Sequence, residues 1–312
     1  MLETIWRDIR FGIRMLMKNP GFTFVAVITL ALGIGANTTI FSLTNKLLLR
    51  RLAVPHPEQI VVLSSPGPKP GHTWSDGDAA NSFSYPLYQQ LRQQAIPIVD
   101  LFARFPVAVN ISGQGQTERA AGELVSGNYF QALQVTPAIG RLFTPADETA
   151  PGADTVGVLS FAYWSKHFGS NRSILNKTIT VNGTSLTVVG VARAGFTGVQ
   201  IGQLPDIFVP ITMKPQMTPN WDGLSEPKDS WIAILGRLKP GFTATRAQAA
   251  MLPLYRAILE SEAPQMRLQA ASRQRFVEKP ILLSAGSQGR PILQASVRQP
   301  LTILLAMVGL VL

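Results

Sequence analysis

Cysteine is absent from the 312-residue chain. Its absence excludes disulfide frameworks, zinc–thiolate sites, iron–sulfur clusters and cysteine nucleophiles, although it fits either redox compartment. Charged residues are also few, at 15%, whereas hydrophobic residues make up 46% of the chain. This balance is more apolar than a soluble enzyme needs, so it introduces membrane proteins as a class to consider.

Motifs for catalysis and cofactor binding are missing as well. His56, His72 and His167 lie too far apart in sequence for metal-ligand spacing. The chain has neither a G-x-S-x-G elbow for a hydrolase nucleophile nor a G-x-x-x-x-G-K-[ST] loop for a nucleotide phosphate. Asp76 and Asp78 lack the other ligands of a calcium loop, and we expect a solvated loop there. We therefore predict no catalytic residue, no metal site, no cofactor and no enzymatic activity.

The net charge of +10 suggests nucleic acid as a partner, but its position in the chain argues against one. Lys and Arg outnumber Asp and Glu by 7 to 2 in residues 1–51 and by 10 to 3 in residues 230–312. Residues 52–229 carry 11 basic and 13 acidic residues. The basic excess thus flanks apolar runs, as expected for side chains that face anionic lipid headgroups. We expect no nucleic-acid partner.

The longest stretch near the start without a charged residue runs from Asn19 to Asn45. As a helix it would extend about 40 Å, more than the ~30 Å hydrocarbon core of a bilayer. We therefore predict a transmembrane helix over residues 19–49. A secretory signal peptide is the main alternative, but its apolar core is shorter and lies closer to the start of the chain.

Residues 1–18 show a helical pattern in which apolar residues recur on one face and charged residues on the other. This pattern predicts an amphipathic helix that lies in the membrane interface. A helix packed on a protein core is the alternative. The positive-inside rule weakly favours a cytoplasmic N-terminus, because basic residues before the apolar stretch slightly outnumber those after it. The candidate membrane-interface residues are Trp6, Arg7, Arg10, Arg14 and Lys18.

Between the apolar ends, short predicted strands and helices alternate with Pro, Gly and Asn turns, which indicates a water-exposed α+β domain. One end reads as strand 60–63, a helix capped by Ser84 and strand 107–111. The other end reads as strand 231–238, helix 243–262 and strand 281–284. Because both ends read strand–helix–strand, we expect them to fold together into one split βαβ layer. The segment between them would then be an inserted subdomain.

The predicted insert contains a hairpin signal at Asn182-Gly183, because both positions tolerate the positive φ of a type I′ turn. Strands 178–181 and 185–191 flank this turn. Strand 156–160, a helix around 161–168 and strand 206–210 complete the predicted insert. Residues 65–83, rich in Pro, Gly, Ser and Asp, are expected to form a mobile loop.

Several longer segments resemble one family. "DIRFGIRMLMKNPGFT" and "ITLALGIGANTTIFSLTNKLLLR" resemble the N-terminal helices of MacB/FtsX-type ABC transporter permeases, especially the duplicated orphan permeases. "GELVSGNYFQALQVTPAIGRLFTPADE", "VGVLSFAYWSKHFG", "TITVNGTSLTVVGVA", "PDIFVPI" and "GRLKPGFTATRAQAAM" resemble successive blocks of the MacB-like periplasmic core domain. These blocks occur in order and extend over almost the whole chain, which makes the resemblance specific.

The resemblance and the residue patterns together predict an α+β fold in which βαβ porter-like halves carry an inserted β-rich subdomain. An amphipathic helix and one transmembrane helix precede this periplasmic domain, and a truncated second transmembrane helix follows it. The expected ranges are a core domain over 50–295, porter-like halves over 52–112 and 230–290, an insert over 113–229 and the second membrane helix from 296 to 312. Residues 301–312 would extend only ~18 Å as a helix, so we expect the chain to be a fragment.

The resemblance implies an inner-membrane protein with a cytoplasmic N-terminus and a large periplasmic domain. It further implies a non-catalytic permease component whose periplasmic domain relays ATP-driven conformational change to export or to a periplasmic partner. The implied partners are the lipid bilayer, a separate ATPase subunit, a periplasmic adaptor or cargo, and a second copy in a full-length dimer. A membrane-anchored binding or scaffold module without transport is the alternative. An anchored periplasmic enzyme is disfavoured because no nucleophile, metal cluster or acid–base pair stands out.

Overall fold

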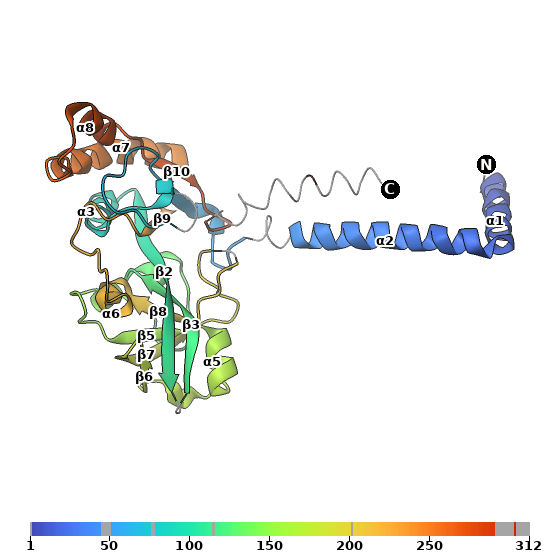
Figure 1. Cartoon of the computed structure of the whole chain (residues 1–312), viewed down its shortest axis with the longest axis horizontal. Helices are drawn as coiled ribbons and strands as arrows, with labels where there is room; N and C mark the ends of the chain where they lie inside the picture. The colour runs from blue at the N-terminus through green and yellow to red at the C-terminus, as the bar shows by residue number, and fades with distance from the viewer. Residues whose placement is uncertain are drawn as a thin grey trace. The chain divides into compact units, whose positions relative to one another are not determined.

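The computed structural model describes residues 2–44, 51–75, 79–113, 116–200, 202–290 and residue 303. The chain divides into two units (Figure 1), one that holds residues 2–44 and one that spans Arg51–Ile292. The predicted second membrane helix over 296–312 lies outside the described residues apart from residue 303. The acidic pair at positions 76 and 78 also lies outside them.

The N-terminal unit consists of helices α1 (Leu2–Lys18) and α2 (Pro20–Thr44). Asn19 separates them, and proline at the first position of α2 fits a helix start because the missing N–H has no helical partner there. Among the described residues, no single helix is both long and apolar enough to cross a membrane. The segments Arg10–Lys18 and Pro20–Gly35, bent by 110°, meet the length and composition requirement only as a pair. The transmembrane helix over residues 19–49 stays a prediction.

The second unit is built on one ten-stranded sheet, and one end of that sheet has the order β10-β1-β9-β2. The elements of this end are β1 (Ile60–Ser64), α3 (Tyr85–Ala95), β2 (Val99–Gly113), β9 (Ala233–Leu238), α7 (Ala244–Glu262), α8 (Ala270–Val277) and β10 (Leu282–Ala285). Strand β9 lies between β1 and β2, and β1 lies between β9 and β10, with every pair antiparallel. Two split βαβ units therefore interleave, as in ferredoxin-like folds. This pairing confirms the prediction that the two ends of the domain form one layer.

The sheet continues beyond β2 in the order β3-β8-β5-β7-β4, and β6 pairs with β2 and β7. Its strands are β3 (Gln116–Val125), β4 (Pro137–Gly140), β5 (Val156–Leu159), β6 (Thr178–Val181), β7 (Thr184–Ala192) and β8 (Ile207–Pro210). The helices are α4 (Tyr129–Ala132), α5 (Phe161–Phe168) and α6 (Lys214–Met217). Short 3₁₀ helices are η2 (Pro57–Gln59), η3 (Ala79–Asn81), η4 (Pro145–Asp147), η5 (Arg172–Ile174) and η6 (Ile211–Met213). The predicted hairpin is confirmed, with positive φ at Asn182 (48°) and Gly183 (80°).

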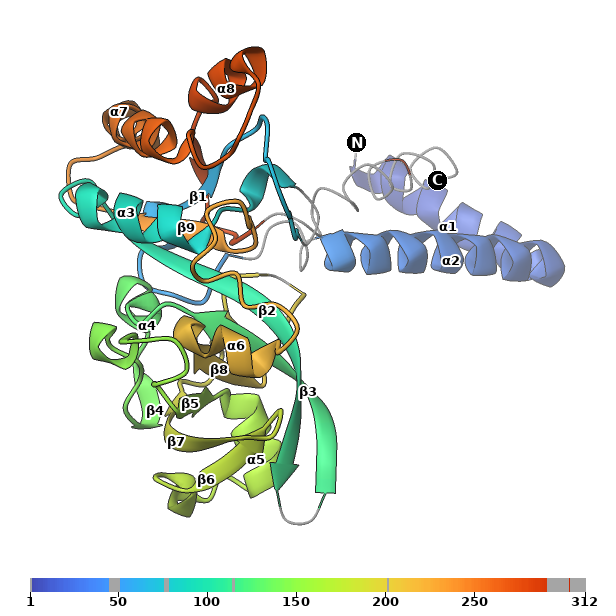
Figure 2. The ribbon, with the colours of Figure 1, turned by 60° about the vertical axis from the view of Figure 1, so that its left-hand side comes forward.

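We use the predicted ranges as names, the porter-like part for residues 52–112 and 230–290 and the inserted part for residues 113–229; the ranges themselves stay a prediction. Strand β2 is longer than predicted, and β3 was missed by the sequence analysis. The two pair from Arg104 opposite Val125 to Gly113 opposite Gln116, so the sheet runs unbroken across both parts. Figure 2 shows β2 and β3 side by side from the porter-like layer toward β6. Strand β3 reads QTERAAGELV, which lacks the β-branched alternation that marks a strand.

Consecutive residues of β2 belong to different hydrophobic clusters. Leu101 and Ala103 join a cluster that contains Tyr88 and Trp231. Phe102 joins a second cluster with Tyr129. Because side chains alternate across a strand, the two clusters lie on opposite faces of the sheet. The domain therefore has a core on each face of β2.

Gly190 on β7 is expected to tolerate no larger residue. A Cβ atom added there would lie 2.0 Å from the backbone oxygen of Arg141, and backbone cannot swing aside as a side chain can. We expect Gly190→Ala to lower the free energy of unfolding by about 3 kcal/mol, measured by urea denaturation followed by tryptophan fluorescence. Gly169→Ala is the control, because a Cβ at that position has no neighbour within 4 Å and only a positive φ of 55° opposes it. Equal losses in the two variants would contradict the close approach at Gly190.

Candidate functional site at the junction of the two parts

The predicted membrane-interface residues lie on α1 and are exposed. Trp6 has 69% of its surface exposed. The side chains of Arg7, Arg10, Arg14 and Lys18 are exposed too. Exposure is what contact with lipid requires, and the interfacial role of these five residues stays a prediction.

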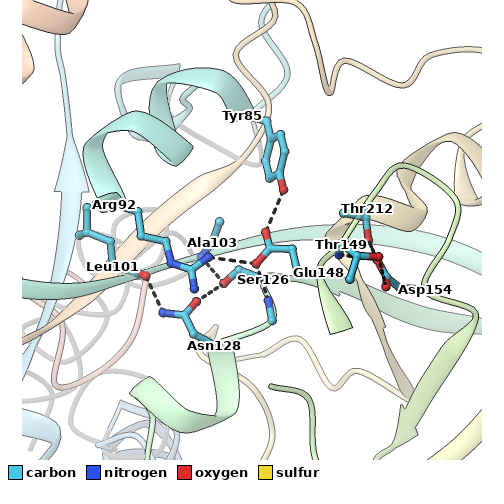
Figure 3. A network of polar contacts seen from close by, with 11 residues as sticks. Tyr85, Arg92, Leu101, Ala103, Ser126, Asn128, Glu148, Thr149, Asp154 and Thr212 are labelled. Carbon is cyan, nitrogen blue, oxygen red and sulfur yellow. Dashed lines mark hydrogen bonds and ion pairs between the residues drawn. The ribbon is translucent and has the colours of Figure 1, made fainter. Parts of the chain in front are cut away.

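A polar network joins the porter-like part to the inserted part around Glu148 (Figure 3). The Glu148 carboxylate accepts hydrogen bonds from Tyr85 Oη at 2.8 Å, Arg92 Nη1 at 3.0 Å and the Gly127 amide at 2.9 Å. Tyr85 and Arg92 belong to α3, whereas Glu148 follows η4 in the inserted part. Burial, reinforced by the Glu148 carboxylate, raises the pKa of Tyr85, so its hydroxyl remains a donor. The Glu148 carboxylate therefore connects α3 to the inserted part through hydrogen bonds.

The same network holds the end of β3 against β2. Ser126 Oγ accepts a hydrogen bond from the Ala103 amide at 3.0 Å and donates to Asn128 Oδ1 at 2.9 Å. Asn128 Nδ2 donates to the Leu101 carbonyl at 2.8 Å. These side chains replace ladder hydrogen bonds where β3 ends, and so they keep the turn into α4 close to β2.

A second carboxylate of the network lies wholly within the inserted part. Asp154 accepts hydrogen bonds from Thr149 Oγ1 at 2.7 Å and from Thr212 Oγ1 at 2.8 Å. Thr212 belongs to η6, which follows β8. Asp154 therefore ties the loop after Glu148 to the end of β8 (Figure 3).

A cleft of about 290 Å³ lies beside this network, lined by Arg92, Leu101, Asn128 and Lys239 among others. Three of its polar side chains already bond to protein groups. Arg92 bonds to Glu148, Asn128 to the Leu101 carbonyl, and Lys239 Nζ to Asp100 Oδ2 at 2.7 Å. A binding site needs polar groups that converge on the ligand, and these three side chains bond to protein instead.

A buried ion pair lies where β2 meets β3. Arg104 and Glu123 are each 1% exposed, and Arg104 Nε donates to Glu123 Oε1 at 2.6 Å. The same guanidinium donates to Gln203 Oε1 at 3.0 Å and to Gln200 Oε1. Two glutamine side chains from one loop thereby complete the coordination of a charge that burial would otherwise make costly.

That loop, residues 193–203 with residue 201 undescribed, also contacts the places where the chain enters and leaves the domain. We call it the strap. Arg193 Nη2 donates to the Ala53 carbonyl, and the Arg290 amide donates to the Val199 carbonyl at 3.0 Å. The Leu52 amide in turn donates to the Ser287 carbonyl at 2.8 Å. The strap therefore connects both ends of the domain to the centre of the sheet.

Lys214 provides a further contact between the two parts. It is 0% exposed, and its Nζ lies 4.1 Å from the ring centre of Trp221, 4.9 Å from that of Trp231 and 5.0 Å from that of Phe105. Its ammonium also donates to the Trp221 carbonyl at 2.9 Å. Burial lowers the pKa of Lys214 to about 8, although Asp222 and Asp229 oppose the change. An aromatic cage thus retains a cation between the inserted part and the porter-like part.

Lys214→Met should change how stability depends on pH. The folded pKa of about 8 lies below the ordinary value of 10.5, so between these values the unfolded chain binds a proton that the folded chain does not. The free energy of unfolding of the wild type should therefore rise over this range, by about 3 kcal/mol, and Lys214→Met should lose that rise. Thermal melts from neutral to alkaline pH measure it. Exposed Lys177→Met serves as control, and a wild-type profile in Lys214→Met would contradict the assignment.

None of the junction residues was singled out from the sequence. Tyr85 and Arg92 lie 63 and 56 positions from Glu148 along the chain, so no local pattern connects them. The only local signal is the Thr144–Asp147 capping box just before Glu148. Within the described ranges, no group of three His, Cys, Asp or Glu residues could hold a metal ion.

The fold and the junction define a class of protein: an α+β domain in which a ferredoxin-like layer carries a β-rich insertion, with the two parts joined by polar contacts. The chain belongs to the family of the MacB-like periplasmic core domain, whose family model matches residues 23–254. It thus carries a MacB-like periplasmic domain of the ABC transporter permease type. This family makes it a membrane protein with a periplasmic domain, and its members are generally non-catalytic.

Two solved structures share the fold. The periplasmic region of MacB from Actinobacillus actinomycetemcomitans gives a TM-score of 0.50 at 13% identity and covers 78% of this chain and 92% of that one. A permease-protein domain from Porphyromonas gingivalis gives a TM-score of 0.50 at 17% identity, with 78% and 98% covered. A search of the curated proteins finds no match.

Proposed function

We propose that this protein is a non-catalytic inner-membrane permease component of a MacB/FtsX-like ABC transporter. Its periplasmic domain relays ATP-driven conformational change from a separate ATPase subunit to export or to a periplasmic adaptor or cargo. The full-length protein acts as a dimer. Membership of the MacB-like family supports this assignment, because its permeases work with ABC ATPase partners.

The observation that carries the proposal is the strap. A relay needs the points where the chain enters and leaves the domain to be connected to its interior. The strap bonds to Ala53 at one point and to Arg290 at the other. It also holds Arg104 at the centre of the sheet. Displacement of either chain segment would therefore act on the strands that join the two parts.

The proposed arrangement in the membrane follows the predicted ranges. Residues 1–18 lie in the interface on the cytoplasmic side, residues 19–49 cross the membrane, residues 50–295 form the periplasmic domain, and residues 296–312 begin a second membrane helix. The absence of charged residues from α2 supports this arrangement, and residues 20–35 of α2 pass the length and composition requirement together with Arg10–Lys18. The exposed Trp6 and the basic residues of α1 would meet the headgroups.

Single-cysteine labelling tests the topology, because the chain has no cysteine that would give background. Ser173→Cys places a thiol on an exposed position of the inserted part, and Arg14→Cys places one on α1. A membrane-impermeant maleimide should label Ser173→Cys in cells with a permeabilised outer membrane, and Arg14→Cys only after lysis. Labelling of Arg14→Cys before lysis, or of Ser173→Cys only after it, would contradict the proposed topology.

The relay is tested on the full-length protein in complex with the ATPase subunit that copurifies with it. Spin labels at Ser173→Cys in the inserted part and Gln265→Cys in the porter-like part, both exposed, report the distance between the parts. ATP should change the distance distribution, and an ATPase inactivated at its own catalytic residue should abolish the change. An unchanged distribution, or a full-length protein with no ATPase partner, would favour the anchored scaffold module instead.

A further inference from the structure

A small cavity is lined by residues of α7 and α8, among others. Its volume is about 20 Å³, and the residues that line it include the polar Glu262, Lys279, Lys69 and Ser84. This volume suits one water molecule, provided that two or more polar partners line the cavity. The lining meets this condition.

Glu262, the last residue of α7, is buried without a full set of partners. It is 3% exposed, and its Oε1 has no hydrogen-bond partner among the described residues. Burial raises the pKa of Glu262 to about 7, although the nearby Lys279 opposes the change. A buried carboxylate oxygen with no donor is costly, so a donor inside the cavity would relieve it.

Lys279, which follows α8, faces the same cavity and is 7% exposed. Its Nζ donates to the Pro68 carbonyl at 3.3 Å and lies 4.2 Å from the ring centre of Phe276. Burial, followed by repulsion from Lys69, lowers the pKa of Lys279 to about 7 against the attraction of Glu262. No ion pair within 4.0 Å joins Glu262 to Lys279 in the described part of the chain.

Two other groups face the pair, Lys69 and Tyr255. Lys69 Nζ donates to the Ser82 carbonyl at 2.5 Å and lies 5.0 Å from the ring centre of Phe83. Tyr255 Oη donates to Ser65 Oγ at 2.7 Å, and burial raises the pKa of Tyr255, so the phenol stays neutral. Glu262 and Lys279 are the groups of the lining whose pKa values lie near 7.

We propose that this cavity is an internal proton-binding site, in which one water molecule joins Glu262 Oε1 to the ammonium groups of Lys279 and Lys69. The water donates to the carboxylate and accepts from an ammonium, which satisfies the orphaned oxygen. The site's protonation state sets how firmly α8 is held, because Lys279 anchors the chain after α8 while Glu262 ends α7. A domain outside the cytoplasm is not protected by cytoplasmic pH control, so this state would follow the pH of the surroundings.

The two groups act on stability in opposite directions. Below neutral pH, the folded chain keeps a proton on Glu262 that the unfolded chain has lost above its pKa of 4.5, so stability falls as pH rises toward 7. Above neutral pH, Lys279 has lost its proton in the folded chain, whereas in the unfolded chain it keeps the proton up to its pKa of 10.5. Stability therefore rises again with pH. The contribution of the site to stability therefore passes through a minimum near neutral pH.

Infrared spectroscopy of the full chain in detergent tests the site directly. We expect a protonated-carboxyl C=O band that disappears between about pH 6 and about pH 8, because ordinary carboxyl groups are already ionised there. Glu262→Gln should lack this band, and Glu260→Gln, an exposed position on the same helix, should keep it. A band that is missing from the wild type, or that persists in Glu262→Gln, would overturn the proposal.

Thermal melts and hydrogen exchange supply a second test that does not depend on transport, so its failure is distinguishable from failure of the proposed function. Lys279→Met combined with Glu262→Gln should remove the minimum near neutral pH and raise the Tm there by about 5 °C. Exchange protection of α8, corrected for the intrinsic pH effect, should show the same minimum in the wild type only. A wild-type profile in the double variant, or an electron-density map with an empty cavity, would contradict the site.

Discussion

Glu123→Gln is expected to lower the free energy of unfolding by about 3 kcal/mol, because it leaves the buried Arg104 guanidinium without its counter-charge. Both residues are 1% exposed, so water cannot replace the lost carboxylate. Their hydrogen bond, at 2.6 Å, is short and charge-assisted. Urea denaturation monitored by tryptophan fluorescence measures the loss, and an unchanged m-value would show that only stability has changed.

A double-mutant cycle with Arg104→Met separates the ion pair from general damage to the core. Each single change leaves the other residue of the pair as a buried charge without its counter-charge. The double variant removes both charges. The double variant should therefore lose less than the two singles together, by about 2 kcal/mol. Glu226→Gln, an exposed position, is the control and should cost little. Additive losses would contradict a direct interaction between Arg104 and Glu123.

Glu148→Ala is expected to lower the free energy of unfolding by about 3 kcal/mol, because three donors lose one acceptor. The donors are Tyr85 Oη, Arg92 Nη1 and the Gly127 amide. The Glu148 side chain is only 6% exposed, so the Gly127 amide and the Tyr85 hydroxyl would remain poorly solvated. The same urea titration measures the effect.

Tyr85→Phe is the matched variant for this prediction, because it removes one of the three donors and keeps the ring. It should cost about 1 kcal/mol, the net value of one buried hydrogen bond. Hydrogen exchange should show the Gly127 amide losing protection in Glu148→Ala and keeping it in Tyr85→Phe. If Glu148→Ala costs no more than Tyr85→Phe, the carboxylate does not connect the two parts as described.

These two predictions concern different kinds of contact between the porter-like and inserted parts. The Arg104–Glu123 pair lies within the continuous sheet, where β2 and β3 are neighbours. Glu148 instead lies in a loop and accepts hydrogen bonds from two side chains of α3 and from the Gly127 amide. A sheet ladder resists separation more than a single carboxylate does. If the two parts move relative to each other as the proposed relay requires, the Glu148 contacts are where we expect the change to begin.

Local residue chemistry determined several elements from the sequence by itself. Ser84 accepts a hydrogen bond from the Leu87 amide and begins α3 as predicted. Thr243 begins α7 in the same way through the Arg246 amide. Asn182-Gly183 forms the predicted turn. Each of these signals depends on residues within a few positions of one another, and such signals are legible in a sequence.

The family assignment also came from the sequence, because long ordered blocks were recognisable without a structure. The assignment is confirmed by the family model over residues 23–254. Neither the local residue patterns nor the family resemblance predicted the individual contacts, because family blocks indicate a fold and not which side chains form hydrogen bonds.

Tertiary structure alone decided the rest. Strand β3 has little strand propensity and exists because β2 and β8 pair with it on either side. The close packing of β3 against β2 requires a small residue at Gly122, because a Cβ at that position would lie 3.0 Å from Val107 Cγ1. The junction likewise depends on partners far apart in the chain, as Glu148 and Tyr85 are 63 positions apart. The sequence determined the elements whose causes are local, and the long-range packing of buried charges decided how the two parts are joined.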